Sequence, residues 1–99
     1  MEFRNLEMVR VIIKDATGLD VSYAYDDLVF PDHTAFIIQF DDSQANNFFC
    51  YFHEDFDKAE QVTIFDCLKS ISMKKKCTMQ SKGAFRLDQK GEEVEIHFS

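Results

Sequence analysis

Histidine and carboxylate side chains come together at two points of the sequence. His53 is followed by Glu54 and Asp55, and Asp32 precedes His33. Imidazole nitrogens and carboxylate oxygens are zinc ligands, so His53, Glu54, Asp32 and His33 are the candidates for a metal site. Structural zinc sites usually show paired ligands at short fixed spacings, and none is present. A polar loop before a helix accounts for the same residues, so we expect no metal and no other cofactor.

Motifs for covalent or phosphate chemistry are missing. Phosphate-binding loops, nucleophile elbows and dinucleotide-binding turns need glycines in a fixed pattern, and the chain has three glycines in all. Pro31-Asp32 with the later Asp88-Gln89-Lys90 imitates a nuclease core, but the two parts lie far apart in the sequence. We assign no catalytic residue. A ligand-binding or hydrolytic domain that uses the acidic loops and His53 stays open as an alternative.

Three cysteines, Cys50, Cys67 and Cys77, occur in unrelated contexts. An odd number without paired spacing fits no disulfide framework and favours reduced thiols. Cys77 follows three lysines, which favour a reactive thiolate; the alternative is an ordinary strand residue. No stretch is long and apolar enough to cross a membrane, and the first residues do not have the pattern of a signal peptide. We therefore expect a cytoplasmic protein.

Charge is unevenly distributed along the 99 residues, whose net charge is −7. Residues 20–66 carry eleven acidic residues and one lysine, whereas residues 67–90 carry seven basic residues and one aspartate. An acidic total repels phosphate and argues against nucleic-acid binding. Nucleic-acid contact through the basic segment 69–90 remains a second alternative. Its candidate patch consists of Lys74, Lys75, Lys76, Lys82 and Arg86.

Hydrophobic periodicity predicts two helices. In the first, Leu6 begins a series of apolar residues at three-four spacing, with Asn5 as N-cap and Gly18 as the stop. The second begins after Asp57, which is spaced from Glu60 as in a capping box. Its expected buried face consists of Val62, Phe65, Leu68, Ile71 and Ser72.

Alternating apolar residues predict the strands. Residues 20–30 contain one strand or two, and 34–40 and 47–53 are strong strands with apolar side chains on both faces. After the second helix we expect short strands at 77–80 and 84–87. A hairpin turn at 89–92 leads to a last strand whose Val94, Ile96 and Phe98 point inward. The expected fold is a single α+β domain, residues 1–99, of order α-β-β-β-α-β-β, with an antiparallel sheet of about five strands.

Large apolar side chains lie on both faces of the strands 34–40 and 47–53. Core packing accounts for them if the second helix covers one face and the first helix covers the other face or an end; in the alternative, one face meets a partner. Tyr23, Tyr25, Phe49 and Tyr51 are residue types that often anchor interfaces. We therefore expect a small cytosolic protein-binding module of the adaptor, chaperone-like or inhibitor type. The acidic surface favours a partner protein with a basic surface. A homodimer through an exposed sheet face or edge is also expected, because a small domain gains stability by association.

Overall fold

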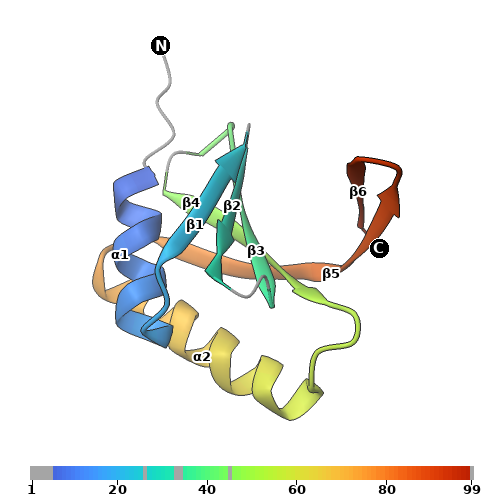
Figure 1. The fold of residues 1–99 in the computed structure, drawn as a ribbon. Coiled ribbons are helices and arrows are strands. Elements are labelled where there is room, and N and C mark those ends of the chain that lie inside the picture. Colours follow the sequence, from blue (N-terminus) through green and yellow to red (C-terminus); the bar gives the residue numbers. More distant parts are fainter. Residues whose placement is uncertain (1–5, 26, 33–34, 45, 99) are drawn as a thin grey trace.

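A computed structural model describes residues 6–25, 27–32, 35–44 and 46–98 (Figure 1). This part of the chain forms an α+β fold, as predicted, in a single small domain. Its elements are α1 (Leu6–Thr17), β1 (Val21–Tyr25), β2 (Leu28–Pro31), β3 (Phe36–Phe40), β4 (Asn47–His53), α2 (Lys58–Lys74), β5 (Thr78–Lys90) and β6 (Glu93–Phe98). None of the described helices is long and apolar enough to span a membrane.

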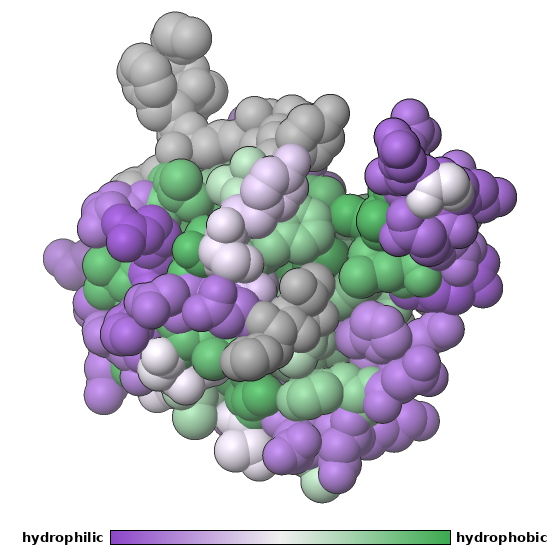
Figure 2. Space-filling model, viewed as in Figure 1, coloured by the Kyte–Doolittle hydropathy of each residue, from purple (hydrophilic) through white to green (hydrophobic). Residues whose placement is uncertain are grey.

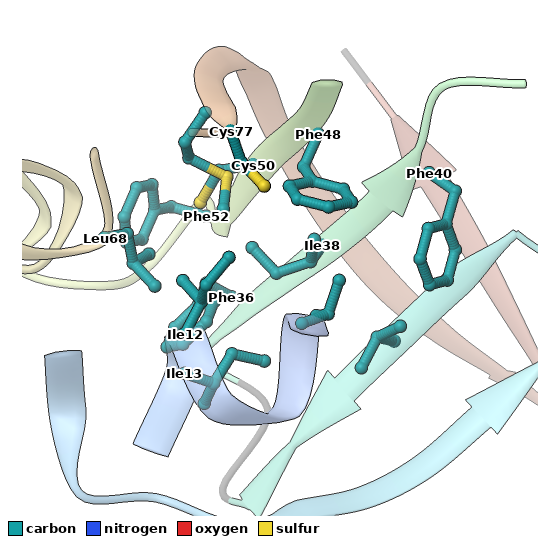
Figure 3. Packing of buried hydrophobic residues seen from close by; sticks show 13 residues of the cluster. Ile12, Ile13, Phe36, Ile38, Phe40, Phe48, Cys50, Phe52, Leu68 and Cys77 are labelled. Carbon is teal, nitrogen blue, oxygen red and sulfur yellow. The ribbon is translucent and has the colours of Figure 1, made fainter. Parts of the chain in front are cut away.

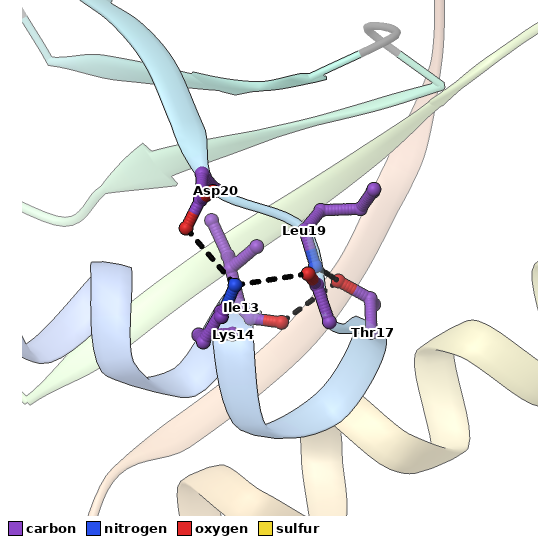
Figure 4. Close-up of polar contacts among 6 residues, drawn as sticks. Ile13, Lys14, Thr17, Leu19 and Asp20 are labelled. Atoms are coloured by element: carbon purple, nitrogen blue, oxygen red, sulfur yellow. Dashed lines mark hydrogen bonds and ion pairs between the residues drawn. The ribbon is translucent and has the colours of Figure 1, made fainter.

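Helix α1 ends at Gly18, as its sequence predicts. Gly18 has a φ of 78°, which glycine adopts at little cost, and its N–H donates to the Lys14 carbonyl at 2.8 Å. The Lys14 ammonium donates to the Gly18 carbonyl and lies 3.2 Å from Asp20 Oδ1 (Figure 4). These bonds fix the turn from α1 into β1. The predicted N-cap Asn5 lies outside the described residues.

Helix α2 begins as predicted, but its buried face is narrower than expected. The Asp57 carboxylate accepts a 2.8 Å bond from the Ala59 N–H and caps the helix. Leu68 and Ser72 are buried, whereas Val62 is 62% exposed. Placing Val62 on the buried face was therefore wrong, because the half-buried residues Gln61, Ile64 and Phe65 define the face of α2 that meets the core, and Val62 lies beside it.

The described strands form one curled, mixed sheet of six strands in the order β1-β2-β3-β4-β5-β6. Neighbours are antiparallel except β4 and β5, which run parallel. The prediction of an antiparallel sheet with about five strands was therefore wrong in both respects. The reason is α2, which carries the chain from the end of β4 back to the start of β5 and so allows two parallel neighbours.

The structure decides one open question about the strands and corrects one prediction. The segment 20–30 forms two strands, β1 and β2. The short strands expected at 77–80 and 84–87 are one continuous strand, β5. Its pairing with β4 shifts between Ser81 and Gly83, so Lys82 is the extra residue of a β-bulge. A bulge bends a strand without ending it, which explains why the polar segment around Gly83 does not break β5.

Both helices pack on one face of the sheet. Ile12 and Ile13 of α1 and Leu68 of α2 point toward Phe36 and Phe52 on the sheet (Figure 3). The predicted alternation of β3 and β4 is confirmed: Phe36, Ile38 and Phe40, with Phe48, Cys50 and Phe52, face this main core. The rings of Phe36 and Phe52 pair across the strands at 5.9 Å between centroids. Hydrophobic contact of this kind fixes the strand register.

Candidate binding groove

The opposite face of the sheet is concave and carries a second apolar cluster. Ile37, Tyr51 and Phe85 are buried there, because the alternate residues of β3, β4 and β5 point away from the helices. Partly buried side chains surround them: Leu28, Phe30, Phe49 and Ile96. No described helix covers this cluster. The curl of the sheet does so in part, by bending the β5–β6 hairpin over it (Figure 1).

A groove of about 670 Å³ lies between the two ends of the curled sheet. Its walls come from β1 and β2 on one side and from β5 and β6 on the other. The lining residues are Tyr23, Leu28, Phe30, Leu87, Glu93, Val94, Ile96 and Phe98. Figure 2 shows hydrophobic surface on the inner side of the projecting hairpin and hydrophilic residues on its outer side.

This groove gathers more than half of the exposed large apolar side chains of the described residues. Of the seven exposed large apolar side chains among the described residues, four line it. Tyr23 is 56% exposed, Leu87 37%, Val94 56% and Phe98 43%. Contiguous exposed apolar surface is uncommon on monomeric proteins and marks binding sites. The groove is therefore the candidate functional site.

A short hydrogen-bond chain crosses the floor of the concave face. The Tyr51 hydroxyl donates to Gln39 Oε1 at 3.0 Å, and Gln39 Nε2 donates to Asp27 Oδ2 at 2.9 Å. Burial, and secondly the negative charge of Asp27, raise the pKa of the Tyr51 phenol. The chain holds an acidic group at the edge of an otherwise apolar surface.

Three of the four predicted interface residues contribute to this concave face. Tyr23 lines the groove, with its ring 5.5 Å from that of Phe30. Phe49 is half-buried in the cluster, and the Lys82 ammonium lies 4.4 Å above its ring. Tyr51 is buried in the floor and is only 7% exposed. Tyr25 belongs to β1, but its side chain lies outside the described part of the structure.

Sequence reasoning missed the hairpin wall of the groove. Leu87 was assigned only to a strand, and the alternation of Val94, Ile96 and Phe98 was interpreted as core packing. Val94, Ile96 and Phe98 do face the same side as the concave cluster, but Ile96 is half-buried whereas Val94 and Phe98 are exposed. The alternation identifies the shared face, but the curl of β5 decides how much solvent reaches it.

The residues proposed as metal ligands do not form a metal site among the described residues. No group of three or more His, Cys, Asp or Glu side chains there is placed to hold an ion. His53 packs edge-on against the Phe85 ring at 5.2 Å, and its Nδ1 accepts the Asp55 N–H. The Asp32 backbone N–H donates to the Asp20 backbone carbonyl, and Glu54 is exposed on a turn. His33 lies outside the described residues.

The five basic residues of the predicted patch occupy different surroundings. Lys74, Lys75 and Lys76 lie at the end of α2, where Lys75 pairs with Asp15 of α1 at 3.5 Å. Lys82 is engaged with Phe49, as above. Arg86 pairs with Asp88 on the outer side of the hairpin at 3.5 Å. Lys75 and Arg86 of the predicted patch are thus paired with carboxylates.

Burial argues against the reactive thiolate considered for Cys77. The residue is 6% exposed and belongs to the main core. Burial raises the pKa of its thiol, and the opposing effect of the Lys75 charge is smaller. A thiol that stays protonated is a poor nucleophile. Cys50 is likewise buried, whereas Cys67 is exposed on α2, and all three thiols are free.

The chain matches no protein-family model, no curated protein and no solved structure.

Proposed function

We propose that this protein is a binding module that takes an extended apolar segment of another protein into the concave groove. One observation carries this proposal: four exposed large apolar side chains converge on a single groove between two sheet edges. Extended segments suit such a place, because alternate side chains enter the groove while the backbone bonds to the edge strand β1. The free thiols support a reducing compartment such as the cytoplasm as the place of action.

Charge favours a segment that also carries lysine or arginine. Glu93 is the one charged residue of the lining, and Asp27 lies beside Leu28 at the floor. The groove lining contains no basic residue to oppose a cation. The net charge of −7 would attract such a segment at long range and would do so less at high salt.

Selection from a displayed library of random peptides of about 12 residues tests the proposal. We expect the selected peptides to carry alternating apolar residues and at least one lysine or arginine. Their affinity should fall with rising salt, and replacing the basic residue by glutamine should reduce that salt dependence. Binding is measured by fluorescence polarisation on the full chain.

A matched pair of variants locates the site. Val94 in the groove and Val62 on α2 are similarly exposed, so neither substitution by glutamine should disturb the core. We expect Val94→Gln to weaken peptide binding at least about tenfold and Val62→Gln to leave it unchanged. Equal binding by both variants, or a selection that yields no peptide, would overturn the proposal. The apolar dye anilinonaphthalene sulfonate serves as a second probe. If the wild type selects no peptide but binds the dye, and Val94→Gln does not bind it while Val62→Gln does, the groove takes a small apolar ligand instead.

A further inference from the structure

The last strand of the sheet has an unpaired edge. β6 pairs with β5 without any register shift, and within the described residues no strand lies on its other side. Proteins usually protect such edges with charged side chains, lysine above all, or with proline or a bulge; β6 carries two glutamates but no lysine, proline or register shift. Its backbone groups are therefore available to another strand.

The two faces of β6 differ in chemistry. Val94 and Phe98 lie on the groove side and are about half exposed. On the outer side, the imidazole of His97 lies 3.3 Å from a Glu95 carboxylate oxygen and 3.2 Å from Asp88 Oδ2 on β5. The strand thus carries apolar residues on one face and an acid–imidazole pair on the other.

A second copy of β6 complements this pattern in one antiparallel register. If the two-fold axis passes through Ile96, then Glu95 lies opposite the His97 of the other copy, and Val94 lies opposite its Phe98. A register centred on Glu95 places the two Glu95 carboxylates opposite each other, which is destabilising. A register centred on His97 pairs the two imidazoles and leaves Glu95 without this partner.

We propose that two copies of this chain pair through their β6 edges, antiparallel and centred on Ile96. The pairing joins two six-stranded sheets, with an acid–imidazole pair on each side of the axis. Val94 and Phe98 of the two copies then extend the apolar surface of both grooves. The acid–imidazole pairs of this dimer lie on the face of β6 away from the groove, and a peptide that bonds to the β1 edge leaves the β6 edge free for the second copy.

Charge exchange at positions 95 and 97 tests the register. Glu95→Lys places a lysine opposite the other copy's imidazole, and His97→Glu places a glutamate opposite the other copy's Glu95. Within one chain, the new lysine faces Asp88 across the hairpin and the new glutamate faces Arg86. The new glutamate also lies beside Asp88 and Glu95, so urea unfolding of both variants is compared with that of the wild type to separate a loss of folding from a loss of pairing. Each variant alone should dimerise at least about tenfold more weakly than the wild type.

Mixing the two single variants gives the decisive outcome. In the mixed pair, the lysine at position 95 faces the glutamate at position 97, and Glu95 faces His97, so one contact is an ion pair and the other is the acid–imidazole pair of the wild type. We expect the equal mixture, and likewise the double variant Glu95→Lys/His97→Glu, to dimerise about as well as the wild type. Sedimentation equilibrium from about 1 µM to about 500 µM measures this, because an edge of six residues forms a small, weak interface.

Two results would overturn the proposal. The first is a wild-type protein that sediments as a monomer over the whole range. The second is dimerisation that the single substitutions leave unchanged, since the interface would then lie elsewhere. Tyr23→Gln, on the β1 wall of the groove and away from β6, provides the comparison with the groove: loss of peptide binding in a protein that still dimerises separates the two sites.

Discussion

At the scale of single residues, the concave face depends on a polar chain within an apolar floor. Tyr51 is the link, because its hydroxyl donates to Gln39, which in turn donates to Asp27. A buried polar group without its partner is costly, so these three residues must be kept together. The chain also positions a carboxylate near the mouth of the groove, where we expect a basic residue of the partner to bind.

Tyr51→Phe should destabilise the protein by about 1 kcal/mol at neutral pH, because it removes one hydrogen bond and leaves Gln39 Oε1 without this donor. The ring contact of residue 51 with Phe98, 4.4 Å between centroids, is kept in this variant. The variant should therefore fold with the hairpin in place. Urea unfolding of both proteins measures the difference.

The same pair of proteins tests the raised pKa of Tyr51 at alkaline pH. Burial and the Asp27 charge hold that pKa above the ordinary value of 10.0, so the unfolded chain ionises first as the pH rises. The wild type should therefore lose free energy of unfolding above about pH 10, beyond the loss in Tyr51→Phe. Parallel curves for the two proteins would contradict the raised pKa.

At the scale of elements, the end of α2 carries a local strain. The Cys77 N–H donates to the Ser72 carbonyl at 2.8 Å, and the Lys76 N–H donates to the Met73 carbonyl at 3.1 Å. This is the Schellman motif, in which the residue after the C-cap is left-handed and is usually glycine. Here Lys76 takes that position, with a φ of 62°.

Two substitutions at helix ends should change stability in opposite directions. Lys76→Gly should stabilise the protein by about 1 kcal/mol, because glycine adopts the left-handed conformation without the steric cost that a side chain brings. Gly18→Ala, at a φ of 78° with open space around the added methyl group, should destabilise it by about 1 kcal/mol for the same reason. Urea unfolding measures both, and effects of equal sign would contradict this explanation.

The elements themselves could be predicted from the sequence better than their arrangement. Alternation in β3 and β4 and the caps at Asp57 and Gly18 are local signals, and the structure agrees with them. The parallel pairing of β4 and β5 is set by where α2 packs, which depends on contacts distant in sequence. The bulge at Lys82 has no distinctive sequence, since the same residues also suit a break between two strands.

At the scale of the whole molecule, the groove arises from the curl of the sheet. Tyr23 and Val94 lie near opposite ends of the chain, and only the curl brings the two edge strands to one groove. Tyr23 could be recognised in the sequence as an interface anchor from its residue type. Val94 could not, because the alternation of Val94 with Glu93 and Glu95 fits a strand packed against the core equally well.

The hairpin should open more easily than the rest of the sheet. β3 and β4 are buried on both faces, whereas every described residue of β6 except Ile96 is exposed. Tyr51 and Phe85 hold the hairpin from one side only, through Phe98 and Ile96. Regions with few buried contacts open at a lower free energy than the global unfolding.

Native-state hydrogen exchange at low protein concentration should therefore show two levels of protection. The amides that bond β5 to β6 should exchange through a local opening, and those that bond β3 to β4 should require global unfolding. Phe98→Ala should lower protection in the hairpin and leave that of β3 nearly unchanged, because it removes the ring contact with Tyr51. Equal protection of both regions would mean that the hairpin belongs to the global unit. If a second strand covers the β6 edge, the protection of the β6 amides should rise with protein concentration. The same exchange spectra, recorded at several concentrations, therefore test both the local opening of the hairpin and the proposed pairing.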